Sequence, residues 1–232
     1  FRPLLSTERT LPGRTVRFPL AASSQSLEPA LSRFVVNPLG DCLLYTFVDT
    51  AYLLDRSPEL VARQLCDGGS DLIQLRAKDL PSDKILGIAE KILPITQRAG
   101  VGFVINDHPR VALAAGAQAC HLGQEDFFDA GHSSRSELLP STSQVRLGLS
   151  SHSPTQAERA IAAQADYIAV GPVFQTPTKP SAKAVTLDQV RWAATHLTLP
   201  WFAIGGISLR NLDDVLAAGA RRICVVSAIL LA

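Results

Sequence analysis

Short apolar segments recur along most of this chain, and each is separated from the next by a stretch with the spacing of an amphipathic helix. From residue 41 onward this unit of strand then helix repeats roughly every 20 to 30 residues. The pattern predicts eight strands, at 43–48, 72–75, 102–105, 119–122, 145–149, 167–170, 201–204 and 223–226. Eight such units in succession are typical of a closed parallel TIM (β/α)8 barrel.

Most of the predicted strands are followed by a helix signal. Ser57 and Pro58 form an N-cap followed by a first-turn proline, and further helices are predicted at 82–99, 109–115, 154–164, 186–196 and 209–218. Residues 227–232 are too few for a full eighth helix, so we expect an α/β barrel that lacks one. An open doubly wound sheet is the second choice, because no Gly-x-Gly-x-x-Gly follows the first strand.

The first 40 residues differ in composition from the rest. They contain arginines at five positions, scattered serine and proline, and only Glu8 and Glu28 as acids. Such a start is compatible with an organelle targeting segment or with a tail. We expect residues 1–40 to be a poorly ordered extension and residues 41–232 to form the catalytic barrel. Within the barrel, the stretch 127–144 is longer than most connections, which predicts a mobile loop or an interface element.

Composition narrows the class of partner. A net charge of +1 provides no basic field for nucleic acid, and no apolar run approaches the ~18 residues of a membrane span, so small molecules are the expected partners. The four cysteines at 42, 66, 120 and 224 are widely spaced in apolar surroundings, which favours reduced buried thiols and a reducing compartment such as the cytoplasm. A homo-oligomer remains open.

Charged residues gather where the second predicted strand ends. In the run Gln74-Leu75-Arg76-Ala77-Lys78, the alternation of a strand directs Gln74, Arg76 and Lys78 to one side. Because residues just beyond the strands of such a barrel converge on one mouth, two cations would stand at that mouth. The alternative is a pair of ordinary surface charges.

Carboxylates follow the next two strands. Asn106-Asp107 ends the third strand, and Asp126 comes shortly after the fourth. Mg²⁺ prefers few protein oxygens and completes its shell with water and ligand phosphate, so Asp107 and Asp126 are candidate metal ligands. Both also lie near predicted helix starts, where N-capping is the ordinary role of aspartate and does not exclude metal binding.

The later strands end in residues suited to phosphate. After the sixth strand, Gly171-Pro172 opens a loop with Thr176, Thr178 and Lys179, which supplies two hydroxyls and one cation. Gly205-Gly206 follows the seventh strand, where backbone amides can approach an anion. The loop with Thr176, Thr178 and Lys179 and the Gly205-Gly206 turn predict one phosphate site, and the cations and carboxylates of the earlier strands predict a second phosphate site with a metal. An enzyme that joins two phosphorylated molecules requires such a pair of sites.

Six motifs in order carry a family resemblance. Gln-Leu-Arg-x-Lys, Asn-Asp, His-Leu-Gly-Gln-x-Asp, Gly-x-Ser-x-His, Gly-Pro-Val-Phe-x-Thr-x-Thr-Lys and Ile-Gly-Gly-Ile resemble the thiamine-phosphate synthase family over roughly residues 43–229. The resemblance implies a barrel that condenses 4-amino-5-hydroxymethyl-2-methylpyrimidine diphosphate with 4-methyl-5-(2-phosphoethyl)thiazole. The products would be thiamine phosphate and diphosphate.

The resemblance also implies a role for each matching residue. The pyrimidine diphosphate would be held by Gln74, Arg76, Lys78, Asn106 and Lys179, and Mg²⁺ by Asp107 and Asp126. The thiazole phosphate would be held by Thr176, Thr178, Gly206, Val226 and Ser227. Ser150 and Lys179 would act at the diphosphate as catalytic residues.

Two other functions stay open at this point. A thiazole tautomerase of the same superfamily uses a histidine for proton transfer, and His152 stands where such a residue would be. The diphosphate and metal residues Gln74, Asn106, Asp107 and Asp126 would be superfluous in a tautomerase. The second alternative is a non-catalytic barrel that binds a phosphorylated ligand, because the short end and the N-terminal segment both depart from the family.

Overall fold

The computed structural model describes residues 9–11, 14–16, 37–176 and 184–232. The chain divides into two compact units, Phe1–Arg33 and Phe34–Ala232. In the first unit, β1 (Arg9–Leu11) pairs antiparallel with β2 (Arg14–Val16). The poorly ordered extension expected over residues 1–40 stays a prediction, because most of that segment lies outside the described residues.

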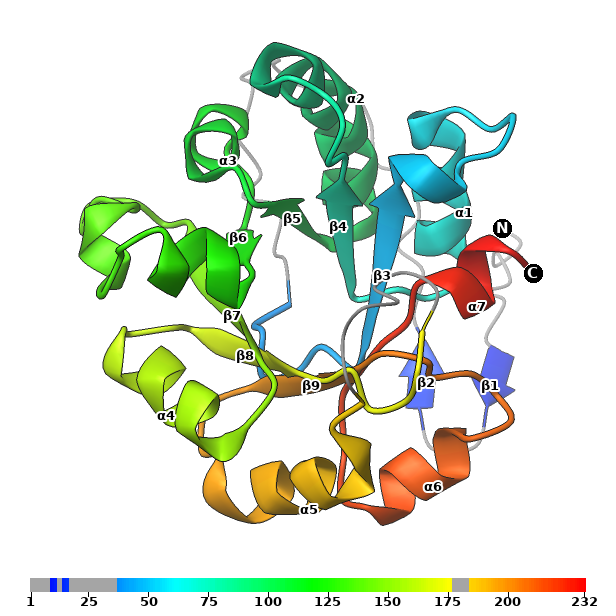
Figure 1. Ribbon diagram of the computed structural model, residues 1–232. Helices are drawn as coiled ribbons and strands as arrows, with labels where there is room; N and C mark the ends of the chain where they lie inside the picture. Colours follow the sequence, from blue (N-terminus) through cyan, green and yellow to red (C-terminus); the bar gives the residue numbers. More distant parts are fainter. Residues whose placement is uncertain (1–8, 12–13, 17–36, 177–183) are drawn as a thin grey trace, which may run out of the picture. The chain divides into compact units, whose positions relative to one another are not determined.

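The second unit is a closed barrel of eight parallel strands, in the order β10-β3-β4-β5-β6-β7-β8-β9 (Figure 1). Its strands are β3 (Leu44–Asp49), β4 (Leu72–Arg76), β5 (Gly102–Asn106), β6 (Ala119–Leu122), β7 (Arg146–Ser151), β8 (Tyr167–Val170), β9 (Trp201–Ile204) and β10 (Ile223–Cys224). Apart from β10, these segments are buried almost throughout, since helices cover one face and side chains fill the interior of the barrel. The predicted fold class is confirmed.

Helices surround the strands in Figure 1. They are α1 (Pro58–Asp67), α2 (Ser82–Ala99), α3 (Pro109–Ala115), α4 (Pro154–Ala162), α5 (Thr186–His196), α6 (Leu212–Ala217) and α7 (Ser227–Leu230). Ser57 caps α1 as predicted, because its hydroxyl accepts the amide of Leu60 at 3.2 Å. Within the described residues, the element after the last strand is the four-residue α7.

Helix α6 begins three residues later than the pattern predicted. The side chain of Asn211 accepts the amide of Ser208 at 2.9 Å and donates to the carbonyl of Gly206 at 2.9 Å. These two hydrogen bonds hold residues 208–211 in a turn, which delays the start of the helix.

The long connection between β6 and β7 is packed against the barrel. It contains a short π-helix, η2 (Glu125–Asp129), and a 3-10 turn, η3 (Arg135–Glu137). Phe127 and Leu139 are fully buried in the core, and Arg135 donates to the carbonyl of Val145 at 2.7 Å. These contacts anchor the connection on the barrel; a role as an interface with another molecule stays a prediction.

A cluster of aromatic rings fills the inside of the barrel. The ring of Tyr45 lies 5.3 Å from that of Phe202 and 6.1 Å from that of Tyr167, measured between centroids. Tyr167 is paired in register with Gly148 on β7. A Cβ atom at position 148 would lie 2.1 Å from the tyrosine ring, so this strand residue must lack a side chain.

We therefore expect Gly148→Ala to lower the free energy of unfolding by about 2 kcal/mol, because the buried ring has no room to retreat. The melting temperature should fall by roughly 5 °C. Gly87→Ala is the matched control: position 87 lies inside α2 with nothing within 4 Å of the added methyl group, so alanine should be neutral or stabilising. Calorimetric melting of both variants checks the pair, and equal stability of the two would contradict this packing.

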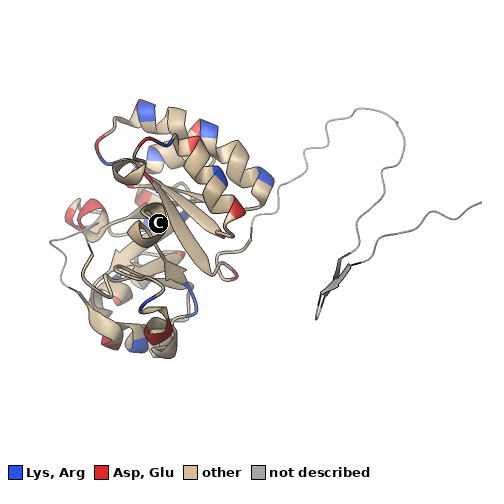
Figure 2. Cartoon of the chain, turned by 90° about the vertical axis from the view of Figure 1, so that its right-hand side faces the viewer, with Lys and Arg blue, Asp and Glu red and all other residues tan. Residues whose placement is uncertain are grey.

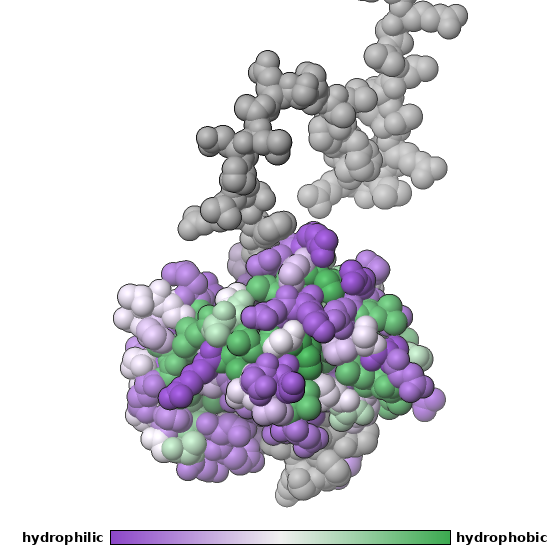
Figure 3. Space-filling view, turned by 90° about the horizontal axis from the view of Figure 1, so that it is seen from above, coloured by the Kyte–Doolittle hydropathy of each residue, from purple (hydrophilic) through white to green (hydrophobic). Residues whose placement is uncertain are grey.

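The outer surface of the barrel is mixed in character. In Figure 2, basic and acidic positions are interspersed over the outer helices, consistent with a net charge of +1. On the face in Figure 3, apolar residues lie between polar ones.

Among the described residues, no helix has the length and apolar content needed to cross a membrane. All four cysteines are free thiols, and Cys42, Cys120 and Cys224 are buried while Cys66 is half-buried.

Candidate active site

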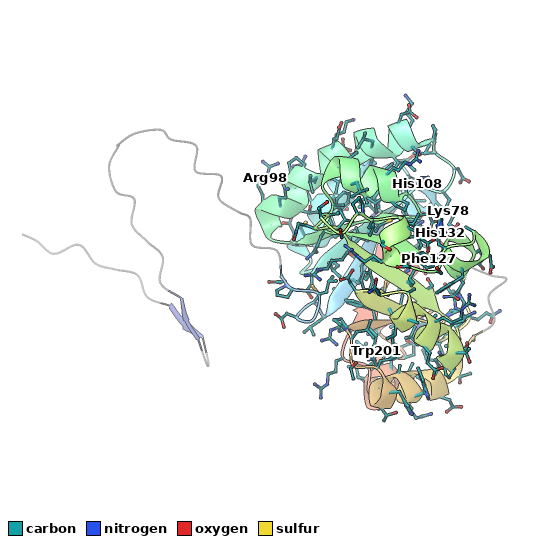
Figure 4. All side chains as sticks on the ribbon, turned by 90° about the vertical axis from the view of Figure 1, so that its left-hand side faces the viewer. Lys78, Arg98, His108, Phe127, His132 and Trp201 are labelled. Atoms are coloured by element: carbon teal, nitrogen blue, oxygen red, sulfur yellow. The ribbon has the colours of Figure 1, made fainter. Side chains whose placement is uncertain are left out.

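A cavity opens where the strands of the barrel end. Its lining includes most of the residues that the sequence singled out: Gln74, Arg76, Lys78, Asn106, Asp107, Asp126, Ser150, Thr176, Gly206, Val226 and Ser227. Figure 4 shows Lys78 and His108 at one end of the barrel and Arg98 at the other. Thr178 and Lys179 lie outside the described residues. Residues scattered over the chain therefore meet at one mouth.

Arg76 is held by a buried carboxylate. Its Nη1 donates to Oδ2 of Asp49 at 2.8 Å, and the two residues are register partners on β4 and β3. Asp49 is 1% exposed, and its other oxygen accepts the amide of Ala51 at 3.0 Å. Both carboxylate oxygens are thus engaged, which fixes the guanidinium at the rim of the cavity. Sequence reasoning missed Asp49, although its place at the end of the first barrel strand was a usable signal.

Lys78 and Asn106 converge on Asp107. The ammonium of Lys78 lies 3.3 Å from Oδ2 of Asp107, and the Asn106 side chain donates to the same oxygen at 2.6 Å. Asp107 itself has φ 59°, a left-handed conformation in which aspartate is one of the few tolerated residues. Its amide donates to the carbonyl of His121 at 2.8 Å, which ties the turn to β6. The backbone strain is localised at a residue that faces the cavity.

Asp126 adds a second carboxyl group beside Asp107. Desolvation raises the pKa of Asp126, and the negative charge of Asp107 and a hydrogen bond between the two side chains raise it further. Such like-charge crowding disfavours two ionised groups unless a cation lies between them. No group of three or more His, Cys, Asp or Glu side chains suited to a metal occurs in the described part of the chain. A cation at this pair would thus need water or ligand oxygens as well.

Inside the mouth, five side chains from five strands are hydrogen bonded in series. Gln74 donates its Nε2 to the hydroxyl of Tyr45, which lies 3.1 Å from the hydroxyl of Tyr167. The Tyr167 hydroxyl lies 3.2 Å from Nδ1 of His121, and Nε2 of His121 lies 3.1 Å from the hydroxyl of Ser150. Burial lowers the pKa of His121 to about 4, so the ring is neutral near pH 7. Sequence reasoning gave no role to Tyr45, to Tyr167 or to His121, although His121 begins the motif His-Leu-Gly-Gln-x-Asp.

His152 also lines the cavity but is engaged by the backbone. Its Nδ1 is hydrogen bonded to the carbonyl of Gly171, and its amide donates to Oε1 of Gln156 at 2.7 Å. The ring is thereby oriented by the start of the loop after β8.

The loop after β8 lies directly on the loop after β9. The amide of Val173 donates to the carbonyl of Ile204 at 2.8 Å, and that of Phe174 donates to the carbonyl of Gly205 at 3.0 Å. A Cβ atom at Gly205 would lie 2.3 Å from Pro172, and one at Gly206 would lie 2.7 Å from the carbonyl oxygen of Gln175. The paired glycines therefore allow the close approach of the two loops, and both have positive φ. Thr176, in the loop after β8, is 9% exposed and lines the cavity.

These features define an α/β-barrel enzyme with its active site at the carboxyl ends of the strands. A family model described as thiamine monophosphate synthase matches residues 44–229. The chain is 46% identical over 182 residues to a thiamine-phosphate synthase of Thermus thermophilus, covering 76% of this chain and 81% of the relative. It is 38% identical over 192 residues to one from Lawsonia intracellularis, covering 82% and 86%.

A solved structure gives the same picture. The thiamine phosphate pyrophosphorylase from Pyrococcus furiosus is similar with a TM-score of 0.74 at 29% identity, covering 84% of this chain and 91% of that one. The chain belongs to the thiamine monophosphate synthase family. It is a transferase with thiamine-phosphate synthase activity in thiamine biosynthesis, which confirms the family resemblance and excludes a non-catalytic barrel.

Proposed function

We propose that this enzyme joins 4-amino-5-hydroxymethyl-2-methylpyrimidine diphosphate to 4-methyl-5-(2-phosphoethyl)thiazole, with Mg²⁺ as cofactor. The observation that carries the proposal is one cavity with two chemically different sides. Arg76, Lys78 and the Asp107–Asp126 pair come from the ends of β4 to β6, whereas Gly205 and Gly206 follow β9. In the closed strand order, β5 and β9 lie four strands apart, which is across the mouth.

The first side suits a metal-bound diphosphate. Two carboxylates in contact, with a lysine 3.3 Å from one of them, make a site in which Mg²⁺ would relieve the carboxyl repulsion and the phosphate oxygens would complete the shell. Arg76, Lys78 and Asn106 supply donors around it, and Gln74 reaches the pyrimidine. Lys179 has the same proposed role from the loop beyond the described residues.

The second side suits a monophosphate. Gly206, Val226 and Ser227 line the cavity together at the ends of β9 and β10. Backbone amides near a glycine turn are the usual phosphate ligands in this part of a barrel. Thr176, together with Thr178 outside the described residues, would orient the thiazole between the two loci.

The chemistry requires no protein nucleophile. As the bond from the methylene carbon to the diphosphate oxygen breaks, the aminopyrimidine carries the positive charge left behind, and the thiazole nitrogen then attacks the methylene. When bound, Mg²⁺ neutralises part of the charge on the leaving diphosphate. Arg76 and Lys78 stabilise the remaining charge, with Ser150 and Lys179 as further donors, and the cavity holds the two substrates in register.

A tautomerase is the weaker alternative for this site. Nδ1 of His152 is engaged by the carbonyl of Gly171, and a tautomerase gives no role to the carboxyl pair.

The four free cysteines support a reducing compartment such as the cytoplasm. We expect small-molecule partners without nucleic acid or membrane; a homo-oligomer stays a prediction.

The deciding experiment mixes the purified protein with both substrates, with and without Mg²⁺, and measures diphosphate release together with thiamine phosphate. We expect both products in equal amounts, only when both substrates and Mg²⁺ are present. Release of diphosphate without the thiazole would indicate a hydrolase instead. Equal turnover after chelation of all divalent ions would exclude the metal from the proposal.

A further inference from the structure

The five hydrogen-bonded side chains form one uninterrupted path through the inside of the barrel. The path runs from Gln74 through Tyr45, Tyr167 and His121 to Ser150, with the three later contacts at 3.1, 3.2 and 3.1 Å. Gln74, Tyr45, His121 and Ser150 all line the cavity, whereas Tyr167 in the middle of the path does not and is 0% exposed. The Ser150 end of the path is also held through its backbone, because the side-chain amide of Gln124 donates to the carbonyl of Ser150. No charged side chain belongs to this path.

Each hydroxyl donates one proton and can accept two, so the contacts between Tyr45 and Ser150 allow two opposite directions, which the tautomer of His121 distinguishes. The amide nitrogen of Gln74 can only donate, which makes Tyr45 an acceptor at that contact. In the direction that continues from this contact, the proton of Tyr45 is directed at Tyr167, and that of Tyr167 at Nδ1 of His121. A neutral imidazole that accepts at Nδ1 carries its proton on Nε2 and donates to Ser150. The hydroxyl proton of Ser150 is left to point into the cavity.

We propose that Tyr167 is a positioning residue that sets the direction of this path, so that Gln74 presents its carbonyl oxygen to the amino group of the pyrimidine and Ser150 donates to the diphosphate. This inference rests on the proposed function for the identity of the ligand. The path joins the part of the substrate that becomes electron-poor to the part that becomes electron-rich. No proton leaves its own heteroatom.

The physical benefit appears in the transition state. Hydrogen bonds aligned in series polarise one another, and those in a desolvated interior are stronger than in water. As charge moves from the pyrimidine to the diphosphate, the aligned dipoles interact more favourably with both ends than they do in the ground state. Interactions that strengthen in the transition state raise kcat and leave KM nearly unchanged.

The first test is the tautomer of His121 in the full, ligand-free protein. Two-bond proton–nitrogen correlations on a sample with labelled histidine distinguish Nε2–H from Nδ1–H. The chain has five histidines, so the His121 signals are assigned by their loss in His121→Gln. We expect the Nε2–H form. The Nδ1–H form would reverse the three hydrogen bonds from Tyr45 to Ser150 and overturn the proposal, whether or not the protein is active.

The second test is kinetic and uses Tyr167→Phe, which removes one hydroxyl and keeps the ring. We expect kcat to fall about tenfold, the equivalent of one hydrogen bond, with KM for both substrates within about twofold. In a Ser150→Ala background the same substitution should cost clearly less, because the path no longer ends in a donor. Tyr52→Phe is the matched control, since Tyr52 does not line the cavity, and it should leave both constants unchanged.

The kinetic outcomes separate this inference from the proposed function. A raised KM with unchanged kcat in Tyr167→Phe would overturn the positioning role, and so would equal effects with and without Ser150. A wild-type protein that forms no thiamine phosphate from the two named substrates would instead overturn the proposed function. In that case the histidine tautomer would still test the direction of the path.

Discussion

Asp107→Asn will reduce Mg²⁺-dependent turnover on the order of 10²- to 10³-fold, the range typical of losing one group that stabilises transition-state charge. Asparagine tolerates the left-handed backbone at φ 59° and can still accept from Asn106, so the substitution removes little besides the charge. Alanine would confound the test with backbone strain. Initial rates measured as a function of Mg²⁺ concentration are the readout, and the half-saturating concentration should rise along with the loss of rate.

The matched control for this prediction is Asp129→Asn. Asp129 belongs to the same short η2 element as Asp126 and is exposed like it, but it does not line the cavity. It should leave the Mg²⁺ dependence unchanged. Undiminished Mg²⁺-dependent activity in Asp107→Asn would remove the metal from this pair of carboxyl groups, whatever the control shows.

Arg76→Ala will lower kcat/KM for the pyrimidine diphosphate by about 10²-fold, because a charged hydrogen-bond donor to the leaving group is lost. The KM of the thiazole phosphate should change little, since that ligand is proposed to bind across the mouth. Initial rates with each substrate varied in turn measure the two effects separately. Equal losses for the two substrates would contradict the assignment of separate loci.

A second variant separates binding from stability in this prediction. Arg76→Ala alone leaves Asp49, which is 1% exposed, without its partner, and a buried unpaired carboxylate is destabilising. The double variant Arg76→Ala, Asp49→Asn removes that charge, so it should recover stability without recovering kcat/KM. Arg63→Ala, on the exposed side of α1, is the control for the loss of an arginine elsewhere.

The fold was predictable because each element is marked locally in the chain. Strands buried on both faces appear as continuous apolar runs such as 167–170, and the bounds of α2, α3 and α5 were predicted from the helical pattern of the sequence. Boundaries failed where a side chain reshapes the backbone, as Asn211 does before α6. Such a turn depends on two hydrogen bonds that no periodicity encodes.

The rim of the site was easier to predict than its interior. Charged residues that directly follow strands, such as Arg76 and Asp107, have an obvious position in a barrel. Tyr45, His121 and Tyr167 lie within the apolar runs themselves, and their hydrogen bonds join strands that are distant in the chain. Only the closed strand order brings them together, so one sequence read by itself treats them as core residues.

The close contact between the loops after β8 and β9 limits how the substrate range of this enzyme can be redesigned. The amides of Val173 and Phe174 donate to the carbonyls of Ile204, the last residue of β9, and Gly205, and Gly205 leaves no room for a side chain against Pro172. Exchanging either loop alone for that of a relative would therefore break the fit of both. Grafts that transplant the two segments together preserve the mutual contacts, so the two loops should be exchanged as one unit.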